Sequence, residues 1–307
     1  GALTPGHPEY KHTKGVEITT GPLGQGLASA VGFAYAQRYM RGLFDPESPV
    51  GASPFDHYVY CIASEGDVQE GVTAEASALA GHQELGNLIV LWDRNHISIE
   101  EDTDVAFTED VPARYRAYGW DVQHVDWTKT GNYVEDVQEL YNAIERAKTV
   151  TDKPSFIEVR TIIGYPAPNK QNTGSVHGSK LGAKEIVETK KVLGFDPEKS
   201  FFIEDEVLAH TRELRERGAA AHKVWNEKFE AWAQANPERA KLYNRLVSGE
   251  MPVDYKAAFP VFEPGTSLAT RAASGKVINA IADTFPELWG GSADLAGSNL
   301  TTINNAE

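Results

Sequence analysis

The chain has 307 residues, of which 41% are apolar and 24% charged, and its formal net charge is −15 at pH 7. This composition is typical of a folded globular protein with room for two domains, and it excludes an intrinsically disordered chain. The acidic balance disfavours partners such as nucleic acid or an anionic membrane, and its simplest interpretation is a solvated surface that aids solubility.

The cysteine content and the hydropathy predict a cytoplasmic protein. Cys61 is the single cysteine, so no intramolecular disulfide is possible, and its place in an apolar run predicts a buried small side chain. No run of about 18 apolar residues predicts a transmembrane helix. The opening residues, GALTPGHPEY, lack the charged and apolar regions of a signal peptide, so we expect none.

The first half of the chain alternates helix and strand patterns. A run with small apolar residues at helical spacing, Gln25–Met40, follows a glycine-bearing turn. Four apolar runs predict buried strands: His57–Ala63, Leu88–Asp93, Val122–Val125 and Ser155–Thr161. An amphipathic helix is predicted between the last two, at Tyr133–Lys148. This alternation predicts an α/β fold with a doubly wound parallel sheet.

The second half predicts a different organisation. Pro166–Leu181 has the composition of a loop, and Glu204–Ser248 predicts one or two long amphipathic helices. Pro252–Pro264 predicts an extended connector. A helix from Ala269 and a short strand at Glu287–Gly290 would open a second α/β domain. We therefore expect a first domain over residues 1–200, a helical and extended linker over 201–264, and the start of another domain over 265–307.

Oxygen-bearing side chains follow two of the predicted strands. Glu65 comes just after the first strand, and Asn95 lies one βαβ unit later, just past the next strand. Because parallel strands end at the same edge of a sheet, both side chains are expected to face one point. Oxygen ligands of this kind hold Mg²⁺ or Ca²⁺, and the cation in turn holds a diphosphate.

Five segments of the chain resemble transketolase signatures, and they occur in transketolase order. They are LTPGHPEY at Leu3–Tyr10, TTGPLGQG at Thr19–Gly26, SEGDVQEG with the later Asn95, TGSVHGSKLG at Thr173–Gly182 and GGSADLAGSNLT at Gly290–Thr301. The resemblance implies the thiamine-diphosphate-binding fold, with thiamine diphosphate and a divalent metal as cofactors. It also implies a partial chain, which lacks the start of the first domain and most of the second and third. By itself such a chain is expected to be incomplete for catalysis.

The resemblance implies that Glu65, the Asn95 side chain and the Ile97 carbonyl are the metal ligands. The family motif has Gly-Asp-Gly where this chain has Ser64, Glu65 and Gly66. Glutamate is longer than aspartate by one bond of about 1.5 Å, so metal affinity or preference is expected to change. Asp67 is the alternative ligand, and a further alternative is that Glu65 and Asp67 only cap a helix beginning near Val68.

The resemblance assigns roles around the cofactor and the substrate. The residues implied to bind the cofactor are Gly21, Leu23, Gly66, Asn95, His177 and Asp294. His7 and His177 are implied to act in catalysis and to contact the substrate hydroxyls, as histidine is suited to do near neutral pH. Arg271 and Ser298 are implied to bind the sugar phosphate.

Other implied features concern a homodimer. Glu70 is implied to act in catalysis through a glutamate network across the dimer interface, and we expect it to share one helix with Glu75. The alternative is a solvated helix face. Arg271, Asp294 and Ser298 are implied to serve the active site of the partner subunit.

The function implied by the resemblance is transketolase activity in the pentose phosphate pathway. Such an enzyme moves a two-carbon ketol unit from a ketose phosphate, such as xylulose 5-phosphate, to an aldose phosphate, such as ribose 5-phosphate. Dihydroxyacetone synthase and deoxyxylulose-phosphate synthase are the alternative enzymes. A non-catalytic cofactor-binding or assembly module is the alternative from another class.

Overall fold

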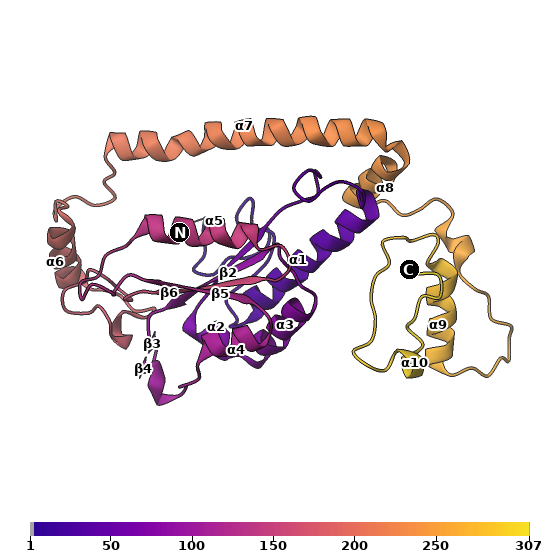
Figure 1. Ribbon diagram of the computed structural model, residues 1–307, viewed down its shortest axis with the longest axis horizontal. Coiled ribbons are helices and arrows are strands. Elements are labelled where there is room, and N and C mark those ends of the chain that lie inside the picture. The colour runs from indigo at the N-terminus through magenta and orange to yellow at the C-terminus, as the bar shows by residue number, and fades with distance from the viewer. Residues whose placement is uncertain (1–2, 307) are drawn as a thin grey trace. The chain divides into compact units, whose positions relative to one another are not determined.

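Four parallel strands form the central sheet, in the order β1-β2-β6-β5 (Figure 1). They are β1 (Val59–Ala63), β2 (Leu88–Arg94), β5 (Asp121–Asp126) and β6 (Ser155–Arg160). Beyond the end of β2, a short antiparallel pair is formed by β3 (Ile97–Ser98) and β4 (Glu101–Asp102). The computed structural model describes residues 3–306, in two compact units, Gly1–Lys228 and Phe229–Glu307. The sheet belongs to the first unit, and all four predicted strands are confirmed.

Helices cover both faces of this sheet, so the predicted doubly wound α/β fold is confirmed. One face packs against α1 (Gln25–Phe44), α3 (Gly71–His82) and α4 (Val111–Ala117), and the other against α5 (Val137–Thr149). The first of these layers is centred on the fully buried Tyr115, whose ring stacks on Phe156 with 3.8 Å between centroids. The Tyr115 hydroxyl lies 3.1 Å from the hydroxyl of Ser77, which satisfies both groups in the core.

The helix boundaries follow from local capping. The Asp136 carboxylate accepts the N–H of Glu139 at 2.9 Å, so α5 begins four residues after the predicted start at Tyr133. The Asp110 carboxylate likewise accepts the N–H of Ala113 and starts α4. Helix α1 begins after Gly24, whose φ of 75° is a left-handed conformation that glycine adopts without a steric penalty.

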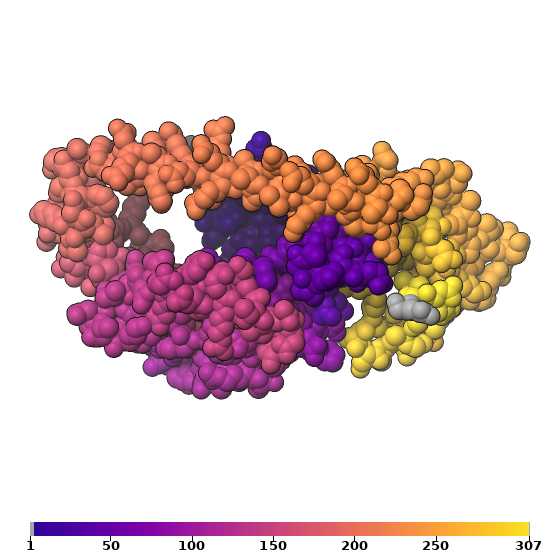
Figure 2. All heavy atoms as spheres, turned by 45° about the horizontal axis from the view of Figure 1, so that its top comes forward, coloured from indigo at the N-terminus to yellow at the C-terminus, as the bar shows by residue number. Residues whose placement is uncertain are grey.

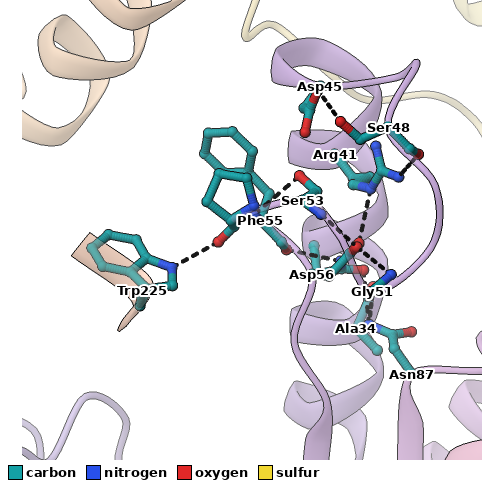
Figure 3. A network of polar contacts seen from close by, with 12 residues as sticks. Ala34, Arg41, Asp45, Ser48, Gly51, Ser53, Phe55, Asp56, Asn87 and Trp225 are labelled. Atoms are coloured by element: carbon teal, nitrogen blue, oxygen red, sulfur yellow. Dashed lines mark hydrogen bonds and ion pairs between the residues drawn. The ribbon is translucent and has the colours of Figure 1, made fainter. Parts of the chain in front are cut away.

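The loop between α1 and β1 is held by a polar network (Figure 3). The Asp56 carboxylate accepts hydrogen bonds from Arg41 Nε at 2.8 Å and from the backbone N–H groups of Gly51 and Ser53. The indole N–H of Trp225 donates to the Pro54 carbonyl at 2.8 Å. These bonds fix the path of the chain into β1, which lies at the edge of the sheet and leaves Ile62 81% exposed.

The later part of the chain is largely helical. Helix α6 (Ala183–Leu193), which the sequence analysis missed, is followed by α7 (Asp205–Ala235) and α8 (Pro237–Ser248). Figure 2 shows α7, in orange, at the surface, and most of its side chains are exposed. The predicted long helical segment is thus two helices, because Pro237 takes the first position of α8 and cannot continue α7. Over the described residues, no helix has the length and apolarity needed to cross a membrane.

The second unit contains α9 (Thr270–Ile281) and the short α10 (Ala296–Asn299). The predicted helix from Ala269 is confirmed, but the predicted strand at Glu287–Gly290 is wrong. No strand is present in the described part of this unit, so this segment has no strand to pair with. The Glu287 carboxylate instead forms a two-pronged ion pair with Arg245, at 2.9 and 2.7 Å.

Candidate functional site

The carboxyl ends of β1 and β2 bring Glu65 beside Asn95. Glu65 follows β1 directly, is only 6% exposed, and accepts the backbone N–H of His96 on Oε1 at 2.7 Å. Burial raises the pKa of Glu65, while that N–H and the nearby Arg94 oppose the rise. This side chain is therefore a buried carboxylate next to the predicted amide ligand.

The chain turns sharply after β2. The Asn95 side-chain oxygen accepts the N–H of Ile97 at 2.9 Å, and His96 between them has a left-handed φ of 66°. Such a conformation is uncommon for a residue other than glycine and often marks a functional segment. It places the predicted ligands Asn95 and Ile97 on one turn, and the His96 N–H between them binds the third, Glu65.

The acidic turn after β1 is itself helical. Helix α2 (Glu65–Gln69) begins at Glu65 and not near Val68 as predicted. Ser64 is its N-cap and forms a capping box with Asp67, whose Oδ2 accepts the Ser64 N–H and hydroxyl, each at 2.8 Å. The other Asp67 oxygen, Oδ1, accepts the N–H of Gly24 at 2.7 Å. Asp67 thus does act as a cap, whereas the buried Glu65 turns to His96.

The glycine-rich turn and the first predicted histidine meet at this place. Gly21 has a φ of 134°, and a Cβ there would lie 2.8 Å from Cγ of His7. A Cβ on Gly66 would lie 2.9 Å from Cδ1 of Leu23. The turn therefore packs closely on α2, beside a cleft of about 450 Å³ whose walls include Gly21, Leu23 and Asp67. Both contacts explain why glycine is needed at these positions.

His177 is exposed at the end of a short 3₁₀ turn, Gly174–Val176. The Gly174 N–H donates to Glu101 Oε2 at 2.8 Å, so this segment is attached to β4. Strand β4 pairs with β3, which begins at Ile97. The predicted His177 segment is therefore joined, through one hairpin, to the predicted metal ligands.

Glu70 and Glu75 do not share one helix, so that prediction is wrong. Glu70 has an extended backbone, with ψ of 139°, and lies between α2 and α3 as the residue that precedes α3. Glu75 lies within α3, and both side chains are exposed. The reason is the short length of α2, which ends at Gln69 before a new helix starts at Gly71.

The predicted phosphate-binding residues lie in the second unit. Arg271 is in α9, Ser298 is in α10 and Asp294 precedes α10. All three side chains are exposed. Their roles stay predictions of the sequence.

A charged cluster near the site was missed by the sequence analysis. Glu158, 4% exposed in β6, pairs with Arg94 and with His124, whose Nδ1 lies 2.8 Å from Glu158 Oε2. The Arg160 guanidinium donates to the Arg94 carbonyl at 3.1 Å. The only sequence signal was a glutamate and an arginine within the apolar run SFIEVR.

The predicted metal ligands differ from the usual clusters of carboxylates and histidines. Within residues 3–306, no three or more His, Cys, Asp or Glu side chains are grouped to hold a metal ion. The predicted set is of another kind, since it contains one carboxylate, one amide oxygen and one backbone carbonyl.

A parallel sheet with oxygen ligands and a glycine-rich turn at its carboxyl edge defines an α/β protein of the diphosphate-binding class. Residues 1–252 match the family model described as transketolase, thiamine diphosphate binding domain. This chain therefore belongs to the transketolase family, as its motifs predicted.

Its relatives agree with this assignment. The chain is 59% identical to transketolase of Mycobacterium tuberculosis over 308 residues, and 47% identical to that of Geobacillus stearothermophilus over 304. These alignments cover 100% and 99% of this chain but only 43% and 44% of the relatives. The chain thus spans less than half of the length of the curated relatives that it matches.

Solved structures give the same result. A Pichia stipitis transketolase in complex with sedoheptulose 7-phosphate superposes with a TM-score of 0.90 at 42% identity. Transketolase from Leishmania mexicana superposes with a TM-score of 0.90 at 39% identity. Each match covers 99% of this chain and 44% of the other.

The residues just past the ends of β1 and β2 fit a metal-bound diphosphate. Glu65 is a buried carboxylate whose negative charge a divalent cation would offset, and Asn95, the residue before its hydrogen-bond donor His96, adds a neutral oxygen. A Cβ on Gly66 would meet the side chain of Leu23, so glycine at this position lets Leu23 pack closely on the start of α2.

Proposed function

We propose that this chain provides the cofactor-binding part of a transketolase that transfers a two-carbon ketol unit from a ketose phosphate to an aldose phosphate. The observation that carries the proposal is that Glu65 accepts a hydrogen bond from the turn that holds Asn95, while Leu23 of the glycine-rich turn packs on Gly66, the residue after Glu65. Structures of Pichia stipitis transketolase contain xylulose 5-phosphate and sedoheptulose 7-phosphate, which supports sugar phosphates as substrates.

Each candidate residue has a role in this proposal. Glu65, Asn95 and the Ile97 carbonyl hold the metal, and the Gly66 backbone approaches the diphosphate. Thiamine diphosphate, when bound, supplies the carbon nucleophile that cleaves the ketose. Leu23 and the Gly21 backbone hold the aminopyrimidine ring.

The histidines act on the substrate. His7 lies against Gly21 and is exposed, so its imidazole is free to donate hydrogen bonds to sugar hydroxyls and to move protons. His177 contacts both the diphosphate and the substrate hydroxyls, from a segment held by Glu101.

The remaining residues complete the site across a homodimer. Arg271 and Ser298 bind the sugar phosphate, and Asp294 lies near the cofactor, all in the partner subunit's active site. Glu70 takes part in a glutamate network between the subunits. The enzyme works in the cytoplasm, in the pentose phosphate pathway.

The metal is Mg²⁺ or Ca²⁺, and Glu65 decides between them. Mg²⁺ demands octahedral geometry at about 2.1 Å, whereas Ca²⁺ accepts 2.3–2.6 Å with variable geometry. The longer glutamate therefore favours Ca²⁺ relative to an aspartate at this position. Glu65→Asp is expected to raise the affinity for Mg²⁺ relative to Ca²⁺, and an unchanged ratio would contradict this assignment.

The experiment that tests the proposed function is a thermal titration with thiamine diphosphate in Mg²⁺ and, separately, in Ca²⁺. A ligand that binds only the folded state stabilises it by RT ln(1 + [L]/Kd), about 2.7 kcal/mol at a hundredfold excess over Kd. A metal-dependent rise in melting temperature that Glu65→Gln abolishes is the expected result. No shift with either metal would overturn the cofactor site.

A second assay separates the enzyme classes. The full chain is given a ketose phosphate with either an aldose phosphate or pyruvate as the other substrate. Transfer to the aldose phosphate supports transketolase, and reaction with pyruvate supports deoxyxylulose-phosphate synthase. Cofactor binding without turnover supports a non-catalytic module, the alternative from another class.

A further inference from the structure

The Asp67 carboxylate connects the two segments that flank the cleft. Its Oδ1 accepts the N–H of Gly24 at 2.7 Å, and its Oδ2 accepts the Ser64 N–H and hydroxyl at 2.8 Å each. Gly24 belongs to the glycine-rich turn at 19–26, while Ser64 and Asp67 belong to the start of α2. Hydrogen bonds to a carboxylate are about twice as strong as neutral ones, so this single side chain ties the turn to the helix.

These bonds leave Asp67 poorly suited to be a metal ligand. Both of its oxygens already accept donors from the protein, and a cation at the same oxygens would compete with three N–H and O–H groups. Glu65 differs, because its Oε1 accepts the His96 N–H, which comes from the residue beside Asn95. The geometry separates the two acids into different tasks.

Ser64 links this arrangement to the departure from the family motif. A glycine at position 64 has no hydroxyl, so it cannot form the reciprocal capping box that Ser64 forms with Asp67. The serine that replaces the first motif glycine therefore fixes the orientation of the Asp67 carboxylate. That orientation is the one that receives the Gly24 N–H.

The packing shows what the bond from Gly24 positions. A Cβ on Gly24 would lie 2.7 Å from Oγ1 of Thr73 and 2.9 Å from Cβ of Glu70, so the turn is seated on the junction of α2 and α3. Leu23, the next residue, rests on Gly66. Loss of the Asp67 bond would free the turn at the point where Leu23 enters the cleft.

We propose that Asp67 is a positioning residue that holds turn 19–26 on α2 and thereby fixes Leu23 and Gly21 for the thiamine ring. It acts separately from Glu65 and Asn95, which hold the metal and the diphosphate. This inference rests on the proposed function for its ligand, but the attachment of the turn is measurable without any cofactor.

The first measurement is hydrogen exchange of the amides in residues 19–26, by mass spectrometry on the full chain without cofactor. Asp67→Ala removes all three bonds and is expected to speed exchange in this segment about tenfold, in line with the strength of hydrogen bonds to charged groups. Asp67→Asn keeps an acceptor for the Gly24 N–H, so its exchange rate is expected to lie between those of the unmodified chain and of Asp67→Ala. Ser64→Ala is the comparison variant: it removes one of the three bonds to Asp67 and leaves the Ser64 and Gly24 N–H donors, so it is expected to speed exchange less than Asp67→Ala does.

The second measurement compares two probes, thiamine diphosphate with Mg²⁺ and inorganic pyrophosphate with Mg²⁺, by calorimetry. Asp67→Ala is expected to lower the affinity for thiamine diphosphate about tenfold and to leave the affinity for magnesium pyrophosphate within about twofold of that of the unmodified chain. Glu65→Gln is expected to weaken both probes. A role confined to stability would lower both affinities in Asp67→Ala together, whereas positioning lowers only one.

Three outcomes would overturn the proposal. Unchanged exchange at residues 19–26 in both Asp67 variants means that Asp67 does not hold the turn. Loss of magnesium pyrophosphate binding in Asp67→Ala with retention in Glu65→Gln makes Asp67 the metal ligand. Equal weakening of both probes in Asp67→Asn, which is expected to fold, reduces its role to general stability. If the unmodified chain binds neither probe, the proposed function fails, and the exchange result still decides whether Asp67 holds the turn.

Discussion

Two glycines near the starts of α1 and α2 allow a matched test of how closely Leu23 packs on α2. A Cβ on Gly66 would lie 2.9 Å from Leu23 Cδ1, whereas a Cβ on Gly26 would lie 3.5 Å from Thr20 Cγ2, an ordinary contact. Both residues are near the start of a helix and neither has a left-handed φ. Gly→Ala therefore gives the same change of backbone entropy at both sites but a clash at only one.

The expected magnitudes follow from these distances. Gly26→Ala is expected to stabilise the fold by about 0.5–1 kcal/mol, the usual gain from alanine over glycine in a helix. Gly66→Ala forces Leu23 to move by roughly half an ångström, the distance to ordinary contact. Since Leu23 is 49% exposed, it is free to turn outward, so we expect little loss of stability. The expected effect of Gly66→Ala is instead a lower affinity for the cofactor.

The assay is urea unfolding of both variants together with calorimetric titration of thiamine diphosphate and Mg²⁺. Gly66→Ala is expected to lower the affinity for the cofactor about tenfold. This equals about 1.4 kcal/mol, a part of what burial of one leucine side chain contributes. Gly26→Ala is expected to lower the affinity for the cofactor less than Gly66→Ala does, because its added methyl meets only Thr20 Cγ2 at an ordinary contact distance. Normal cofactor affinity in Gly66→Ala would refute the assignment of Leu23 and Gly66 to the cofactor site.

Three further predictions concern single side chains. Burial raises the pKa of Cys61 to about 12, so we expect iodoacetamide to alkylate it about a thousandfold more slowly at pH 8 than in the unfolded chain; a rate within tenfold would contradict this. Because the unfolded thiol loses its proton first, the Cys61 contribution to the free energy of unfolding falls as pH rises from about 9 to 12. Tyr115→Phe is expected to cost about 0.5–1.5 kcal/mol in urea unfolding through loss of the Ser77 bond, and Tyr115→Ala about 3–5 kcal/mol; equal costs would show that packing on Phe156 contributes little. Glu101→Ala is expected to speed amide exchange at Gly174 about tenfold, and unchanged exchange there would mean that another contact holds the His177 segment.

The sheet was predictable because each of its strands coincides with an apolar run of the sequence. The strands β2 and β6 are buried on both faces, so they show as runs dominated by Val, Ile, Leu and Phe. The convergence of Glu65 with Asn95 followed from the βαβ connection alone. Such features depend on local pattern and on the geometry of parallel strands.

Features that depend on pairing over a long distance were not predictable. The Glu158 pairs with Arg94 and His124 depend on the register of three strands, which the sequence does not state. The strand expected at Glu287–Gly290 failed for the same reason, because a strand exists only with a partner. The capping box at Ser64 had a local pattern, Ser-x-x-Asp, that the glycine motif around it obscured.

The central claim is that Glu65 binds the metal that holds the diphosphate. The most direct test replaces Mg²⁺ with Mn²⁺, adds thiamine diphosphate, and records the ³¹P hyperfine coupling by pulsed electron paramagnetic resonance. The account predicts coupling from phosphate bound to Mn²⁺ in the unmodified chain and in Asp67→Asn, and its loss in Glu65→Gln. Coupling that persists in Glu65→Gln and disappears in Asp67→Asn would contradict it.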